Sequence, residues 1–186
     1  MVILIKKQVA CFGDSIIYGF PYVDSSWLKT FNQNSTQLHL LNYGVCGFTY
    51  NDVLEKIQTT YLAPEIKAIL LMAGLNDLLE GRPLKYIIDD LKKIVLFCQT
   101  KNLPTYIILP LLTKDQALNL KINDLKVKLC EEFVSTSKVL DLYPIIIDNF
   151  GIDNLLGWDG IHPSVIGYEQ IALSAFTPLE EWGRQL

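Results

Sequence analysis

The sequence predicts a three-layer α/β/α domain built on a parallel sheet. Apolar runs rich in branched residues alternate along the chain with segments of helical periodicity. These runs are almost continuously hydrophobic, which is typical of strands covered on both faces and therefore of a parallel sheet. Such alternation places helices on both sides of one sheet and functional loops at the carboxyl ends of the strands.

The expected strands and helices follow one another in strict alternation. Strands are expected at residues 8–12, 38–43, 68–72, 105–109 and 139–142, and helices at 25–31, 51–61, 84–100, 115–134 and 163–175. The helix at 84–100 has the clearest pattern, because apolar residues recur every three or four positions and charged residues occupy the other face. That pattern indicates a helix packed on a sheet.

Length and composition favour one globular domain over residues 1–186. Hydrophobic residues make up 50% of the 186 and charged residues 19%, which suits a substantial core. The formal net charge is −4 and lysines and arginines form no long cluster, so nucleic acid is not an expected partner. The apolar runs are too short for stable membrane insertion. The sequence is compatible with a homo-oligomer as well as a monomer.

The N-terminus and the cysteines both indicate a cytoplasmic protein. Lys6 and Lys7 come after the apolar residues of the N-terminus, which is the reverse of a secretory signal. The four cysteines are widely spaced, without a Cys-x-x-Cys pair or a nearby histidine. We therefore expect reduced thiols and no metal site.

Candidate catalytic residues lie near the two ends of the chain. Gly13-Asp14-Ser15 follows the first expected strand, and Asp159-Gly160-Ile161-His162 precedes the last expected helix. A serine hydroxyl needs a neutral imidazole beside it, and a carboxylate that fixes the tautomer of that imidazole, to act as a nucleophile near neutral pH. Ser15, His162 and Asp159 supply this set, so the sequence predicts a serine hydrolase.

Two further blocks complete a series along the chain. The four are Gly13-Asp14-Ser15, Asn42-Tyr43-Gly44-Val45-Cys46-Gly47, Gly74-Leu75-Asn76-Asp77 and Asp159-Gly160-Ile161-His162-Pro163. This series resembles the SGNH superfamily of GDSL-type lipases and esterases. The resemblance implies a five-stranded parallel, flavodoxin-like sheet and a carboxylic ester hydrolase without metal or organic cofactor. Ser15 is followed by Ile16-Ile17, without the second glycine of a Gly-x-Ser-x-Gly elbow, which also disfavours the α/β-hydrolase fold.

The resemblance implies a role for each block. Ser15 would be the nucleophile, His162 the base, and Asp159 the carboxylate that orients His162. The backbone N–H groups of Ser15 and Gly44 and the side-chain amide of Asn76 would hold the tetrahedral oxyanion. A glycine at position 44 would let the main chain approach the substrate without a Cβ in the way. An amide is a neutral donor, so Asn76 could serve at any pH.

Each of these residues also has a purely structural alternative. Asp14 and Ser15 are common helix caps, and glycines or an Asn-Asp pair are common in turns, as at Gly44, Gly47 and Asn76-Asp77.

Other polar residues are weaker candidates for a catalytic role. His39, the other histidine, lies within an expected strand, and we expect it to be structural. Asp141 and Asp153 are alternative orienting acids, but neither has the short spacing to His162 that Asp159 has.

Apolar and aromatic residues surround the expected site. We expect Tyr18, Phe20, Leu111 and Trp158 to form the substrate-binding cleft, with Pro21, Tyr22 and Leu112 nearby. Such a cleft suits a small-molecule acyl ester better than a phosphate. A carbohydrate O-acetylesterase, a lysophospholipase and a thioesterase are alternatives that use the same machinery. A non-catalytic flavodoxin-like binding module is the rival from another class.

Overall fold

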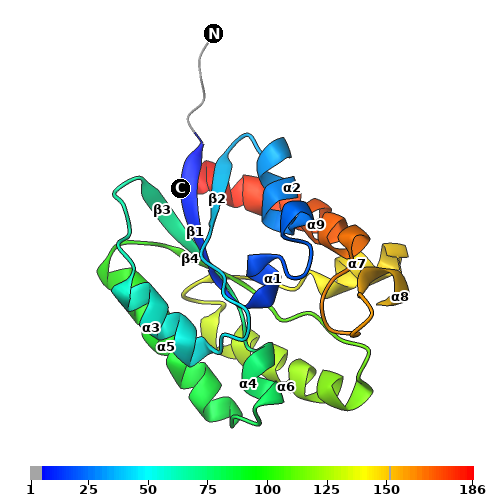
Figure 1. The fold of residues 1–186 in the computed structure, drawn as a ribbon. Coiled ribbons are helices and arrows are strands. Elements are labelled where there is room, and N and C mark those ends of the chain that lie inside the picture. Colours follow the sequence, from blue (N-terminus) through cyan, green and yellow to red (C-terminus); the bar gives the residue numbers. More distant parts are fainter. Residues whose placement is uncertain (1–5, 151) are drawn as a thin grey trace.

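The sheet at the centre of the molecule is parallel throughout (Figure 1). The computed structural model describes residues 6–150 and 152–186, with the side chains of residues 147–153 outside that description. Within these residues the sheet has the strand order β2-β1-β3-β4-β5. The bounds are β1 Lys7–Gly13, β2 Leu38–Asn42, β3 Ile66–Met72, β4 Thr105–Ile108 and β5 Lys138–Leu140. This order is the flavodoxin-like one, so the predicted fold class is confirmed.

Helices cover both faces of the sheet. One face carries α3 (Tyr50–Thr59), α5 (Leu84–Thr100) and α6 (Gln116–Phe133), and the other carries α2 (Trp27–Asn34) and α9 (Val165–Gln185). Shorter elements connect them, namely α1 (Ser15–Tyr18), the 3-10 turn η1 (Val23–Ser25), α4 (Leu75–Leu79), α7 (Tyr143–Phe150) and α8 (Ile152–Leu155). Among the described residues, no helix has the length and apolar character needed to cross a bilayer.

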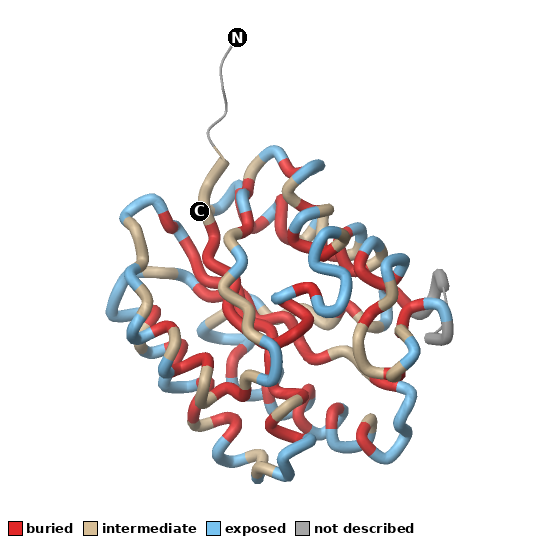
Figure 2. Tube along the Cα trace, in the orientation of Figure 1, coloured by how far each residue is buried: buried red, intermediate tan, exposed pale blue. Residues whose placement is uncertain are grey.

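Two hydrophobic cores lie on opposite sides of the sheet. Ala10 and Phe12 of β1 pack with α3 and α5, whereas Val9 and Cys11 pack with α2 and α9. They separate in this way because successive side chains of a strand point to opposite faces. Figure 2 shows the buried segments running along the strands and the inner sides of the helices. The strands are almost continuously hydrophobic because helices cover both faces of the sheet.

Each predicted strand and helix is present, and apart from the end of the last helix its bounds differ from the prediction by at most three residues. Helix α5 begins and ends at the predicted residues. Helices α1, α4, α7 and α8 were not predicted, and α9 was predicted to end at residue 175 but continues to Gln185. Pro178 lies inside α9 and removes one backbone donor. Leu179 and Trp182 beyond it are buried, so tertiary packing keeps this segment helical.

Glu180 joins the end of α9 to the loop before β2. Its carboxylate accepts hydrogen bonds from Ser35 Oγ at 2.5 Å and Thr36 Oγ1 at 2.8 Å, and from the N–H groups of Thr36 and Gln37 at 3.2 Å each. Burial acts to raise the pKa of Glu180, but these bonds outweigh it and lower that pKa below its ordinary value. The last helix is thereby fixed against the β2 edge of the sheet.

Candidate active site

Ser15 lies at the carboxyl end of β1, as the first residue of α1. Asp14 is the N-cap of that helix, and its Oδ1 accepts the N–H of Ile16 at 2.9 Å. Gly13 passes so close to β3 that a Cβ there would lie 1.9 Å from the carbonyl oxygen of Met72. The strand and the cap together fix the backbone of Ser15, which is 8% exposed. The capping role considered for Asp14 is therefore observed.

The loop before α9 holds His162 through Asp159. Asp159 Oδ1 accepts the backbone N–H groups of Ile161 and His162 at 2.9 Å each, and Asp159 Oδ2 lies 2.6 Å from His162 Nδ1. Burial acts to raise the pKa of Asp159, but the hydrogen bonds from the imidazole and the two N–H groups outweigh it and lower that pKa. One carboxylate therefore orders the loop and orients the imidazole.

Ser15 and His162 are in hydrogen-bond contact. The distance from Ser15 Oγ to His162 Nε2 is 2.9 Å. An ionised carboxylate only accepts hydrogen bonds, so Asp159 favours the tautomer with its proton on Nδ1 and leaves Nε2 as an acceptor for the serine hydroxyl. This is the geometry that a serine needs to lose its proton as it attacks an acyl carbon.

Phe20 packs against the imidazole from the loop after α1. Its ring lies edge-on to His162, with centroids 4.8 Å apart and planes at 67°. The carbonyl of Phe20 accepts a hydrogen bond from the hydroxyl of Tyr168 at 2.6 Å. The side chain of Phe20 is 39% exposed, so it covers one side of His162 and still faces solvent.

Asn76 lies in α4, at the carboxyl end of β3. One N–H of its amide donates to the carbonyl of Phe48 at 3.0 Å. An amide nitrogen carries two N–H groups, so this bond orients the side chain and leaves the second donor for another acceptor.

The N–H of Gly44 is already engaged in the structure. It donates to Asn42 Oδ1 at 2.9 Å. A Cβ at position 44 would lie 2.4 Å from the nitrogen of Tyr18 and 2.8 Å from Ile17. A glycine here therefore allows close packing of the loop on the backbone of α1. Asn42 also donates to the carbonyl of Tyr18 at 3.2 Å.

Gly47, three residues further along, is in a different environment. Its φ is +83°, and no atom lies within 4 Å of the position that a Cβ would take. It directly precedes Phe48, whose carbonyl is bonded to Asn76. Among the described residues, no hydrogen bond occupies its N–H. The sequence offers Gly47 only as a turn glycine, and nothing in it distinguishes the environments of the two glycines.

The residues expected to form the cleft are exposed to different degrees. Tyr18 is 40% exposed beside Phe20, and the side chain of Trp158 is 88% exposed next to Asp159. Leu111 lines a small apolar cavity of about 20 Å³ together with Pro163, the residue after His162. Of these residues, Phe20 contacts His162, Leu111 lies beside Pro163 at the cavity, and Trp158 is largely exposed to solvent.

The other polar residues considered from the sequence have no contact with Ser15 or His162 among the described side chains. Asp141 accepts hydrogen bonds from Lys126 Nζ at 2.9 and 3.1 Å, which leaves Asp159 as the carboxylate on His162. The side chain of Asp153 lies outside the described residues. His39 is exposed on the edge strand β2.

The four cysteines are free thiols. The described residues contain no cluster of three or more His, Cys, Asp or Glu side chains arranged to hold a metal ion.

Solved structures share this fold. A lipolytic protein of the G-D-S-L family from Desulfitobacterium hafniense has a TM-score of 0.78 at 23% identity, covering 92% of this chain and 98% of that one. A G-D-S-L family protein from Veillonella parvula has a TM-score of 0.78 at 26% identity, with coverage of 90% and 95%. A psychrotrophic esterase from Pseudoalteromonas has a TM-score of 0.79 at 17% identity, with coverage of 95% and 98%.

Sequence comparison defines the family more directly. No curated protein matched the chain. The model of the GDSL-like lipase/acylhydrolase family matches residues 11–170. That stretch contains the four sequence blocks and the hydrogen-bonded Ser15, His162 and Asp159. The chain therefore belongs to the GDSL-like lipase/acylhydrolase family.

Proposed function

We propose that the protein is a serine esterase that cleaves carboxylic esters through an acyl-Ser15 intermediate. The observation that carries this proposal is the unbroken chain of hydrogen bonds from Asp159 Oδ2 to His162 Nδ1, at 2.6 Å, and from His162 Nε2 to Ser15 Oγ, at 2.9 Å. Membership of the acylhydrolase family supports the same reaction class.

In this mechanism Ser15 Oγ attacks the ester carbonyl while its proton passes to His162 Nε2. The tetrahedral intermediate collapses, the carbon–oxygen bond to the alcohol breaks, and His162 returns the proton to the departing oxygen. Water then attacks the acyl-serine with His162 again as the base, which releases the acid and restores Ser15. Asp159 stays ionised and stabilises the imidazolium in both steps.

The oxyanion would be held by the N–H of Ser15, the amide of Asn76 and one glycine N–H. Gly44 was expected to supply the last donor, but its N–H is bonded to Asn42. We propose Gly47 for this role, because its N–H has no partner among the described residues and open space lies beside it. It is also next to Phe48, whose carbonyl orients Asn76.

Covalent labelling with a fluorophosphonate tests the nucleophile directly. We expect wild-type protein to be labelled, and Ser15→Ala and His162→Ala to lose both labelling and ester hydrolysis. The double variant should resemble either single variant, since residues that act as one unit have non-additive effects. Ser135→Ala, in an exposed loop, is the matched control and should label normally. An unlabelled wild-type protein would support the non-catalytic binding module instead.

A substrate panel would identify the class of ester that the protein cleaves. The partly exposed aromatic ring of Phe20 against His162 supports an uncharged acyl ester. One similar fold is an acetylxylan esterase from Geobacillus stearothermophilus, with a TM-score of 0.77 at 17% identity and 94% coverage of both chains. We therefore propose a panel of p-nitrophenyl esters from acetyl to palmitoyl, acetylated sugars, a lysophospholipid and an acyl thioester. The ranking of kcat/KM identifies the class.

A further inference from the structure

Asn76 is carried by a helix that needs outside support. Helix α4 is five residues long, and its N-cap is Gly74, which offers no side chain and has a φ of +105°. Helices this short have little stability of their own. The position of the Asn76 amide therefore depends on the contacts that α4 makes with the rest of the protein.

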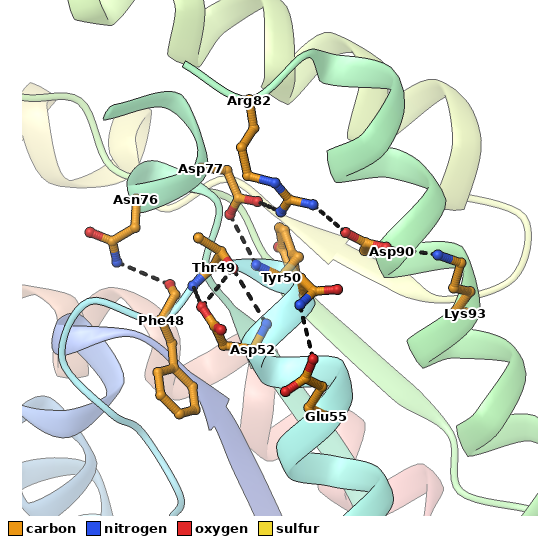
Figure 3. A network of polar contacts seen from close by, with 11 residues as sticks. Phe48, Thr49, Tyr50, Asp52, Glu55, Asn76, Asp77, Arg82, Asp90 and Lys93 are labelled. Atoms are coloured by element: carbon orange, nitrogen blue, oxygen red, sulfur yellow. Dashed lines mark hydrogen bonds and ion pairs between the residues drawn. The ribbon is translucent and has the colours of Figure 1, made fainter. Parts of the chain in front are cut away.

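Leu75 and Leu78 of α4 pack in the core, and the polar support of α4 runs through Asp77, as Figure 3 shows. Asp77 is fully buried, and its Oδ2 accepts the backbone N–H of Tyr50, the first residue of α3, at 3.0 Å. Its Oδ1 is bound by the guanidinium of Arg82, whose backbone N–H also donates to the carbonyl of Asp77 at 2.8 Å. Asp77 therefore connects α4 to the start of α3.

Arg82 joins this buried carboxylate to a second helix. Its Nη2 lies 2.6 Å from Oδ2 of Asp90 in α5, and Asp90 Oδ1 also accepts from Lys93 Nζ at 2.9 Å. The Arg82 side chain is 23% exposed, whereas the side chains of Asp77 and Asp90 are 0% and 7% exposed. A single planar guanidinium thus bridges two carboxylates that are almost completely removed from water.

The charge of Arg82 is needed because Asp77 is buried. Burial raises the pKa of Asp77, and the Tyr50 N–H and the Arg82 guanidinium offset part of that rise. Burial acts to lower the pKa of Arg82, but Asp90 and Asp77 outweigh it and raise that pKa, so the arginine stays charged. Without Arg82, a buried carboxylate would have no countercharge, and such groups take up a proton or draw in water.

We propose that Arg82 is a positioning residue for ester hydrolysis, which holds the Asn76 amide at the oxyanion through the Asp77 bridge between α4 and α3. The inference rests on the proposed function, because it assigns a role only if Asn76 binds the oxyanion. Arg82 itself does not touch the substrate.

The same bridge also affects the glycine loop. Tyr50 follows Gly47 and Phe48 by only a few residues, and Phe48 accepts from Asn76 while Tyr50 donates to Asp77. Two adjacent residues of α4 thus bind two positions at the entry to α3. Movement of α4 would displace the Asn76 amide relative to Gly47, and a shift of about 1 Å can lower a rate by roughly 10²-fold.

The first test compares Arg82→Met with Lys126→Met. Lys126 is the matched control because it is also a buried cation paired with a carboxylate, and its hydrogen bonds go to Asp141 rather than to α3 or α4. We expect Arg82→Met to lower kcat by roughly 10- to 100-fold with little change in KM, since the loss falls on the transition state. Lys126→Met should destabilise the fold and keep kcat. Equal kcat values in wild type and Arg82→Met would overturn the proposal.

Two double variants separate positioning from general damage. Adding Arg82→Met to Asn76→Ala should lower kcat by less than about threefold, because the group that Arg82 positions is already gone. Adding Asp77→Asn to Arg82→Met should recover most of the lost kcat, because a neutral amide can accept from Tyr50 without a countercharge. Full additivity in the first case, or no recovery in the second, contradicts the mechanism.

A conservative variant keeps the test usable if Arg82→Met folds poorly. Arg82→Lys keeps the charge but cannot bridge both carboxylates, and it should lower kcat less than Arg82→Met does. Fluorophosphonate labelling of wild-type protein is run in parallel. Absence of labelling there would reject the esterase itself, whereas labelled wild type with unaffected Arg82 variants would reject only the positioning role.

Discussion

Two aspartates flank the candidate site, and their surroundings shift their pKa values in opposite directions. Asp159 accepts three hydrogen bonds, from His162 Nδ1 and from the N–H groups of Ile161 and His162, and its pKa is lowered. Burial raises the pKa of Asp14 to about 7, although the N–H of Ile16 opposes that rise, and the negative charge of Asp77 adds to it.

The difference shows that closeness to the site does not determine the charge of a carboxyl group. Asp14 immediately precedes Ser15, but it is buried, and within the described part of the chain no cation acts on its pKa. Asp159 is partly exposed and is surrounded by donors. The number of donors and access to water decide the direction of the pKa shift, and one aspartate orients an imidazole while the other caps a helix.

The largest effect is expected for Asp159→Asn. The amide can accept the loop N–H groups but cannot stabilise an imidazolium, and its own N–H favours the wrong tautomer of His162. We expect kcat to fall by about 10²–10⁴-fold. Steady-state kinetics check this, with circular dichroism as the control for folding. A variant that keeps wild-type kcat would show that Asp159 only orders the loop.

Asp14→Asn should act on stability instead. Because the folded-state pKa is raised, native Asp14 retains a proton that the unfolded chain loses, so stability falls as pH rises from about 4 through about 7. The pKa of Asp14 rises by about three units on folding, which corresponds to a loss of roughly 4 kcal/mol of unfolding free energy above pH 7. Asparagine can keep the cap to Ile16 and cannot ionise, so the variant should be the more stable protein at pH 8.

Urea unfolding at pH 5 and pH 8 measures the effect of Asp14→Asn. We expect the free energies of unfolding of wild type and variant to be closer at pH 5 than at pH 8. If the wild-type loss between the two pH values persisted unchanged in the variant, another group would be responsible for it.

Glu180→Gln extends the comparison to a carboxylate far from Ser15. Like Asp159, Glu180 has several donors and a lowered pKa, so its stabilising contribution is present above the unfolded-state pKa and is lost as pH falls through the folded-state value. We expect the variant to lose about 2 kcal/mol of unfolding free energy at pH 7 and to keep kcat. Thermal melting and ester hydrolysis on one preparation check both. A large loss of kcat would mean that α9 transmits strain to His162.

The smallest expected effect is that of a chelator. A bound divalent cation would be the largest local charge and would change the state of both aspartates. We expect EDTA to leave kcat and the unfolding free energy unchanged. Activity lost with EDTA and restored by zinc would require a new account of the charges around His162.

The sequence could predict what depends on local patterns. Periodicity predicts the strands and α5, and a short motif predicts the pairing of Asp159 with His162. The structure brings these two residues to Ser15. The role of Arg82 could not be predicted, because the carboxylates that it bridges become neighbours only after α4 and α5 pack. The difference between Gly44 and Gly47 could not be predicted either, because it depends on the packing and hydrogen bonding of the folded loop.

The contact between Ser15 and His162 makes the site a reporter of complete folding. The two residues are 147 positions apart, and their reacting atoms are 2.9 Å apart. During synthesis the serine emerges well before the histidine and before α9, the helix that packs on α2. A chain whose last helix has not docked retains its serine but lacks the base beside it. The rate at which fluorophosphonate labelling appears during refolding would therefore report how fast α9 docks on the rest of the fold.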